Sequence, residues 1–146
     1  MSHVQTQILS RLMTLLTGLP TTGSRVYQGR VHPLTPGTMP GLCVSLGGET
    51  PTGGTTKATQ KEVELVVDVY VGGDDYTVSG QVQVEVEAAL YGDRVGGRFF
   101  NSLATNLIYG GERREFVTLG ALKHTKVSIT YKTEYQTVDG VANAAN

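Results

Sequence analysis

Residues 61–71, which read KEVELVVDVYV, decide the fold of this 146-residue chain. Apolar side chains occupy every second position from Val63 to Val71, and the alternate positions, starting at Glu62, include Glu64 and Asp68. Successive side chains of a β-strand point to opposite faces, so this alternation predicts a strand with one buried face. At about 3.3 Å per residue the strand would be roughly 35 Å long, which is long for a domain of this size.

The segments around this strand predict two helices and further strands. Apolar residues recur every three or four positions over residues 3–17, which is typical of an amphipathic helix. Residues 76–90 fit both a strand-like and a helix-like pattern, and the aspartates before them and Gly92 after them favour a helix. Strands are predicted over residues 25–27, 42–46, 106–109, 114–119 and 126–135, and one helical turn over residues 99–103. The fold class is therefore α+β, with a mostly antiparallel sheet of four to five strands and two main helices packed on one face.

Two segments have the composition of irregular structure. Residues 47–60 contain four glycines, one proline and several threonines but no large apolar side chain, which predicts a mobile loop or a hairpin tip. After residue 135 the sequence is small and polar, so residues 136–146 are predicted to form a flexible C-terminal tail. Residues 1–135 would then form a single α+β domain, as the total length suggests.

Composition and charge exclude several classes of protein. A single cysteine allows neither an internal disulfide nor a cysteine-based zinc cluster. The formal net charge of −1 argues against a nucleic-acid module, whose surface is usually basic. No apolar run approaches the roughly 18 residues of a membrane span, and the polar start argues against a secretory signal. These features are typical of a soluble protein made in a reducing cytoplasm.

The histidines and the cysteine do not form the kind of cluster that catalysis needs. His3, His32 and His124 are far apart in the sequence and share no metal-ligand spacing, so each is interpreted as an ordinary surface or loop residue. Cys43 lies inside a predicted strand, where a buried and unreactive thiol is expected. We therefore expect no catalytic residue and no metal site.

The glycine-rich segment fails the test for a phosphate-binding loop. Gly48 and Gly53 have the required spacing, but Gly54 stands where that motif needs a lysine. The segment also precedes a predicted strand, whereas bound phosphate needs the N-terminus of a helix. We therefore expect no cofactor.

The long predicted strands and the segments without core residues favour a protein that works by assembly with partners. Arg113 and Arg114, flanked by Glu112 and Glu115, are either a solvated turn of mixed charge or a polar contact with a partner. The long strands and glycine-rich segment exceed what a core of this size needs. Such projections commonly gain order by pairing with another chain.

Five segments in fixed order carry a resemblance to a known family. An amphipathic helix leads into RVYQGR at 25–30, and a proline-rich bridge leads to PGLCVSL at 40–46 and GGET at 47–50. EVELVVDVYV at 62–71 precedes a helix containing VEAAL at 86–90, and VSITYKTEY follows at 127–135. Across residues 3–135 this order resembles the tail terminator, or tail completion, proteins of long-tailed bacteriophages, the family of minor tail protein U. The polar extension after residue 135 is not a fixed part of that pattern.

The resemblance implies a structural virion protein and no enzyme. Its copies would form a hexameric ring at the head-proximal end of the tail tube, end tube polymerisation and provide the surface for head-tail joining. The implied partners are further copies of the chain, the tail tube protein and the head-tail connector or stopper protein. No membrane contact and no sequence-specific nucleic-acid contact is implied. Two structural alternatives stay open: another neck or connector protein, such as a head-closure stopper, and a tail tube subunit. A third alternative is a small cytoplasmic enzyme or ligand-binding domain, which would need a concave pocket with convergent polar groups.

Carried onto this sequence, the resemblance places contacts on the glycine-rich segment and on arginines. A ring closes only when each copy offers complementary surfaces to its two neighbours, so polar and unpaired groups are the natural candidates. Each arginine could equally be an ordinary surface residue, and Tyr131 is expected to be core. The expected subunit or tube contacts are Arg25, Arg30, Glu49, Thr50, Thr52, Thr55, Thr56, Lys57, Arg113 and Arg114.

Overall fold

The computed structural model of the chain describes residues 4–29, 39–54, 58–73, 76–100, 103–119, 122–138 and 141–145. The stretch that reads KEVELVVDVYV lies inside one long strand, so the strand prediction for it is confirmed. In chain order the elements are α1 (Val4–Leu16), β1 (Val26–Gln28), β2 (Gly41–Gly54), β3 (Ala58–Gly72), α2 (Tyr76–Tyr91), β4 (Ile108–Leu119), β5 (Leu122–Val138) and β6 (Val141–Ala145).

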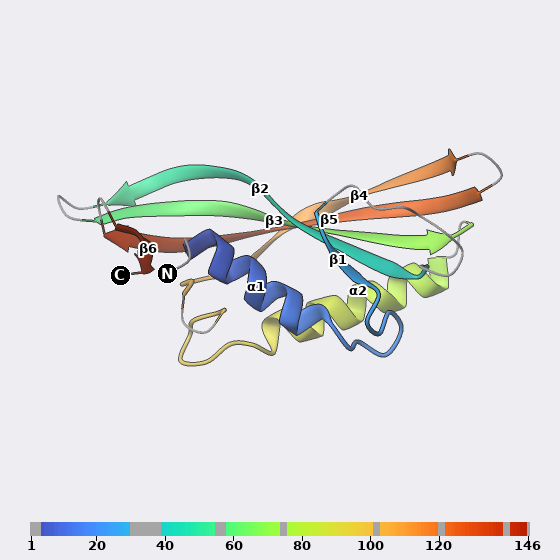
Figure 1. The fold of residues 1–146 in the computed structure, drawn as a ribbon, viewed down its shortest axis with the longest axis horizontal. Coiled ribbons are helices and arrows are strands. Elements are labelled where there is room, and N and C mark those ends of the chain that lie inside the picture. Colours follow the sequence, from blue (N-terminus) through green and yellow to red (C-terminus); the bar gives the residue numbers. More distant parts are fainter. Residues whose placement is uncertain are drawn as a thin grey trace.

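The strands form one sheet with a long central pair. The order is β1-β2-β3-β5-β4, and β6 pairs with the end of β5 (Figure 1). β1 runs parallel to β2, and the other described pairs are antiparallel. β3 and β5 pair along the whole of β3, from Ala58 opposite Val138 to Gly72 opposite His124. This pair runs along the length of the molecule and sets its elongated shape.

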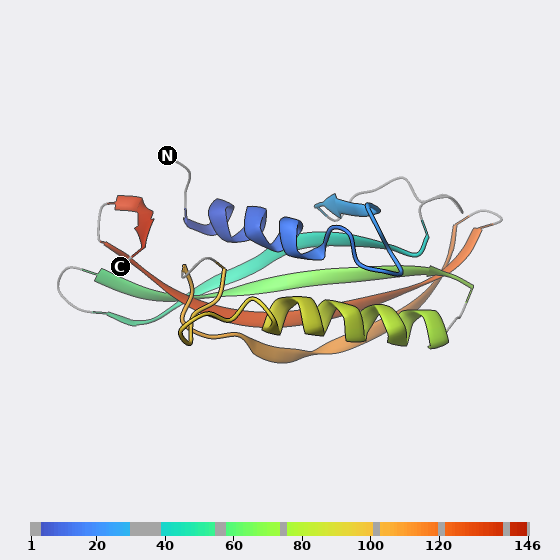
Figure 2. The same cartoon turned by 90° about the horizontal axis from the view of Figure 1, so that it is seen from below.

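Both helices pack on the same face of the sheet (Figures 1 and 2). In α1 every fourth residue is buried, from Val4 to Leu16, and in α2 the buried apolar residues are Val82, Val86 and Leu90. They meet the apolar face of β3, on which Val63, Leu65, Val67, Val69 and Val71 are buried. The predicted α+β class, with two helices on one face of a mostly antiparallel sheet, is therefore confirmed.

Residues 47–60 differ from the predicted mobile loop and match the hairpin alternative. Glu49 pairs with Val63, and Gly54 pairs with Thr59, so the segment continues β2 and β3 up to the undescribed residues 55–57. The ladder has irregularities after Leu46 and after Pro51. The segment has no apolar alternation to predict a strand. Its order comes from pairing with β3, which is itself paired with β5.

Three other boundaries also differ from the prediction. The two weak strand candidates after residue 105 form one strand, β4, because they pair continuously with β5 apart from one irregularity near Gly110. Residues 136–138 continue β5 and residues 141–145 form β6, in place of the predicted tail. No helix forms among the described residues around position 100: Phe99 bridges to Ala104, and Phe100 has a φ of 55° that interrupts regular structure.

Candidate interaction surfaces

The first surface is an arm made of residues 49–54 of β2 and 58–61 of β3. β1 pairs only with Leu42, Cys43 and Val44, so among the described residues no strand covers the outer edge of β2 over residues 45–54. Every residue of β2 from Gly47 onward is exposed. An edge of this kind presents unpaired backbone N–H and C=O groups that can pair with another chain.

A buried tyrosine fixes the base of the arm. The Tyr135 side chain is fully buried, and its hydroxyl donates a 2.7 Å hydrogen bond to Glu49 Oε2. Lys61 Nζ lies 3.6 Å from the other oxygen of the same carboxylate. Burial and the bond to Glu49 both raise the pKa of Tyr135, so the hydroxyl keeps its proton and remains a donor. The Glu49 carboxylate is thus held at the base of the arm, although Glu49 as a whole is exposed to solvent.

Glu134 of β5 ties the arm down from the opposite face of the sheet. Its carboxylate accepts hydrogen bonds from Gln60 Nε2 at 2.5 Å, from Asn106 Nδ2 at 3.1 Å and from Thr52 Oγ1 at 3.5 Å. One side chain therefore connects both strands of the arm to the segment before β4. Thr50 is exposed and pairs with Glu62 in the ladder.

The predicted arginine contacts divide into internal and external residues. Arg25 Nε donates to the carbonyl oxygen of Pro40 at 2.8 Å, and its Nη2 donates to that of Thr21 at 2.9 Å. Arg114 Nη2 donates to Ser79 Oγ at 3.2 Å, and its guanidinium carbon lies 4.3 Å from the centre of the Tyr76 ring. Both side chains therefore hold elements of the same chain together. Arg30, Thr55, Thr56 and Lys57 lie outside the described residues.

Arg113 is exposed on the sheet face opposite the helices. It lines a polar cavity of about 420 Å³ together with Lys126, Ser128 and Glu64. Below this cavity Ser128 Oγ donates a 2.6 Å hydrogen bond to the fully buried Asp68. Of the four predicted arginines, Arg113 is therefore the one that the described structure leaves in the position of a surface contact.

A second group of surface residues, which the sequence reasoning missed, lies on α2, on β4 and on the segment between them. We call it the apolar patch: its members are large hydrophobic side chains that remain exposed, and within the described residues they all fall between positions 76 and 116. They are Tyr76, Val84, Tyr91, Val95, Ile108, Tyr109 and Phe116. Single exposed hydrophobic residues are normal, so their arrangement decides what they mean. Val84 and Tyr109 line one common groove, whereas Ile108 is opposite Lys132 in the ladder and points to the other face of the sheet. Val84 could have indicated this surface from the sequence, because it lies off the stripe of Val82, Val86 and Leu90 that a helix over these residues would bury.

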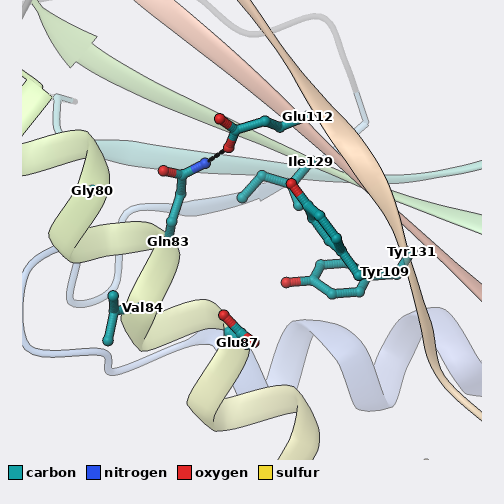
Figure 3. Close-up of a pocket in the computed structure, with 8 residues that line it drawn as sticks. All are labelled: Gly80, Gln83, Val84, Glu87, Tyr109, Glu112, Ile129 and Tyr131. Atoms are coloured by element: carbon teal, nitrogen blue, oxygen red, sulfur yellow. Dashed lines mark hydrogen bonds between the residues drawn. The ribbon is translucent and has the colours of Figure 1, made fainter.

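A groove of about 380 Å³ runs through this patch between α2 and β4 (Figure 3). Ile129 and Tyr131 of β5, both 2% exposed, contribute to its lining. Tyr109, which is 52% exposed, stands edge-on to Tyr131 with ring centres 5.8 Å apart. Gly80, Gln83, Val84 and Glu87 line the helix side. The expectation that Tyr131 belongs to the core is confirmed.

The groove carries two carboxylates. Gln83 of α2 donates a hydrogen bond to Glu112 of β4, which joins the two walls (Figure 3). Glu87 lines the same groove, and its residue is exposed. Burial, and then the charges of Glu112 and Glu87, raise the pKa of Tyr109. The groove therefore combines apolar and aromatic walls with two carboxylate groups.

The buried thiol and imidazole do not form a reactive centre with each other. Cys43 is 1% exposed, as predicted, and burial followed by the charge of Asp68 raises the pKa of its thiol to about 11. His124 is 2% exposed within β5, and its ring is tilted against that of Tyr70 with centres 5.9 Å apart, so the prediction of a surface or loop histidine is wrong for this residue. Burial and the nearby Lys126 lower the pKa of His124. His3 and His32 lie outside the described residues.

The described part of the chain contains neither a cluster of metal ligands nor a helix suited to a membrane span. No three His, Cys, Asp or Glu residues gather closely enough there to hold a metal ion. Neither described helix has the length and apolar character needed to cross a bilayer.

Known proteins resemble this chain in structure and not in sequence. No protein-family model and no curated protein sequence matches the chain. Among solved structures, the chain is similar to one in the virion of a native gene transfer agent (GTA) particle. The similarity covers 90% of this chain and 92% of that chain, with 18% sequence identity and a TM-score of 0.48.

Proposed function

We propose that this chain is a structural protein of a long-tailed phage virion and acts as its tail terminator. Its copies close into a hexameric ring at the head-proximal end of the tail tube. The ring stops tube polymerisation and provides the surface to which the head-side connector joins. The role is structural, and it requires the chain to bind its neighbours and the tube without transforming any molecule.

The observation that carries this proposal is the arm. Among the residues that the structure describes, no strand covers its outer edge on β2 over residues 45–54, and residues 49–54 are exposed. Tyr135 and Glu134 fix the arm to β5 from both faces of the sheet. An ordered arm with an open edge can add its strand to a neighbouring copy with little loss of conformational entropy. The arm would supply one half of a head-to-tail interface, and such interfaces close into rings when the rotation between copies permits.

The resemblance of the sequence to tail terminators supports the same role. The segments that carry it correspond to α1, β1, β2, β3, α2 and β5, in the order of that pattern. Contacts through Glu49, Thr50, Thr52 and Arg113 remain part of the proposal, because all four residues are exposed. Arg25 and Arg114 are less suited to it, since their guanidinium groups bind within the chain.

The first experiment compares tails assembled with and without the protein by electron microscopy. A terminator predicts tubes of uniform length with a capped end when the protein is present, and overlong or ragged tubes when it is absent. The purified protein should form rings or remain monomeric. Long tubes formed by the purified protein would identify a tube subunit instead, and normal tube length without it would contradict the proposal in favour of a stopper.

A shortened arm tests the observation itself. Replacing residues 52–60 by Asn-Gly would join Pro51 and Lys61, which pair in the ladder, through a two-residue hairpin turn. The Tyr135–Glu49 bond remains, so we expect a folded monomer that no longer forms rings in native mass spectrometry. The matched control is Thr50→Ser with Thr52→Ser, which keeps the length and edge of the arm and should keep the rings. Rings of the shortened variant would show that the arm is not an interface.

A further inference from the structure

The groove between α2 and β4 lies beside a second open edge. β4 is the last strand of the sheet, and no described strand pairs on its outer side. Proteins usually protect such an edge with charge, proline or a short strand. β4 carries four charged residues at 112–115 and an irregularity near Gly110, but it is 12 residues long and exposes Tyr109 and Phe116 on either side of that charged run. The edge is therefore protected by charge over its middle and left apolar on either side, where its unpaired backbone is open to another chain.

Gly80 keeps the groove open at the cost of helix stability. It lies inside α2 and lines the groove, and a Cβ atom placed on it would meet nothing within 4 Å. A glycine inside a helix costs about 1 kcal/mol relative to alanine. Close packing does not require a glycine here, because the neighbouring space is empty. The missing side chain therefore leaves room for a side chain from outside.

The chemistry of the groove selects the kind of side chain that fits. Ile129, Tyr131 and Tyr109 offer apolar and aromatic surface to an apolar group. Glu87 and Glu112 place carboxylates in the same groove, and these attract a cation. Arg114, which lies on the same face of β4 as Glu112, already binds Ser79 and the Tyr76 ring. An apolar side chain next to a lysine or arginine is thus complementary to the site.

We propose that this groove binds an extended, basic segment of a partner protein, which adds as a strand to β4. Its backbone pairs with the open edge, one apolar side chain enters the space beside Gly80, and a neighbouring Lys or Arg faces Glu87 and Glu112. This is recognition by strand addition, in which backbone hydrogen bonds give affinity and a flanking pocket gives selectivity. A second copy of this chain is a poorer match, because its other open edge, residues 45–54, carries Glu49 as its one charged residue.

The test uses peptides and the full-length monomer. The probe is a fluorescein-labelled nonapeptide of alternating Thr and Val with Leu-Lys at its centre, and its control has Glu in place of the Lys. In fluorescence anisotropy at low salt we expect the Lys peptide to bind at least tenfold more tightly than the Glu peptide. Because the assay uses the monomer, it is independent of ring formation and of the terminator role.

Two variants locate the binding in the groove. Gly80→Gln fills the space and should lower the affinity for the Lys peptide at least tenfold. The matched control Gly80→Ala should change this affinity less than twofold. Glu87→Lys should reverse the preference between the two peptides. Equal binding of both peptides, or wild-type affinity in Gly80→Gln, would overturn the proposal. So would self-association that Gly80→Gln abolishes, since that result would assign the groove to a second copy.

Discussion

Arg113 and Arg114 are neighbours on β4 with opposite environments, and alanine substitutions should separate them. Arg114→Ala removes the 3.2 Å hydrogen bond to Ser79 Oγ and the contact with the Tyr76 ring. Ser79 is fully buried, so the bond is worth about 1 kcal/mol, and the ring contact adds about 0.5 kcal/mol because Tyr76 is largely exposed. We expect a loss of about 1–2 kcal/mol, which for a chain of this size lowers Tm by roughly 3–8 °C.

The assay is thermal unfolding of both variants, monitored by circular dichroism. A urea titration of each variant gives the free energy of unfolding independently. Arg113→Ala is the matched control: its side chain is exposed at the polar cavity, and we expect a change below about 0.5 kcal/mol. Arg114→Lys keeps the charge but loses the planar guanidinium, so it should recover only part of the stability. Equal Tm values for the two alanine variants would refute the assignment of Arg114 to the interior contacts of the chain.

Further expected outcomes concern the core, the pH dependence and the thiol. Val67→Asp should prevent folding, because it buries an unpaired charge among the fully buried residues of β3; a folded variant with native circular dichroism would show that the strand face is wrongly assigned. Burial opposes ionisation of Glu85, but hydrogen bonds from Thr21 and Gln81 outweigh it and lower the pKa of the carboxyl group. Glu85 therefore stabilises the fold above its ordinary pKa of 4.5, and this contribution is lost as the pH falls through the lower folded value. The difference in urea midpoint between wild type and Glu85→Gln should be present at pH 7 and absent in strong acid, and a constant difference would contradict this. With its pKa raised to about 11, Cys43 should react with Ellman's reagent at pH 8 only after urea is added, whereas immediate reaction in the native state would place the thiol at the surface.

The regular elements were predictable because their periodicity is strong and local. Val63 to Val71 alternate without interruption, and Val4, Ile8, Leu12 and Leu16 repeat every fourth residue. The sheet and helix faces follow directly from these two repeats. Residues 76–90 were predicted as a helix from their flanking signals, and α2 occupies that position.

The surfaces were less predictable because they depend on which strands become neighbours. The arm has no apolar repeat, and its strands form through pairing with β3 and β5. Arg113 and Arg114 differ in role because neighbours in a strand point to opposite faces, and the pairing of Arg114 with Val127 turns it, rather than Arg113, toward the helices. The groove arises where β4 ends the sheet beside Gly80, and no local pattern says which strand is last.

The continuous pairing of β3 with β5 has a mechanical consequence. Their register joins 15 residue pairs between Ala58 and Gly72 on one strand and Val138 and His124 on the other. A force that pulls the two strands past each other along their length loads all these backbone hydrogen bonds in shear at the same time. A force that pulls the strands apart from one end would instead break the hydrogen bonds one pair after another. The protein should therefore be stiffest along its long axis, with β5 transmitting force from one end of the subunit to the other.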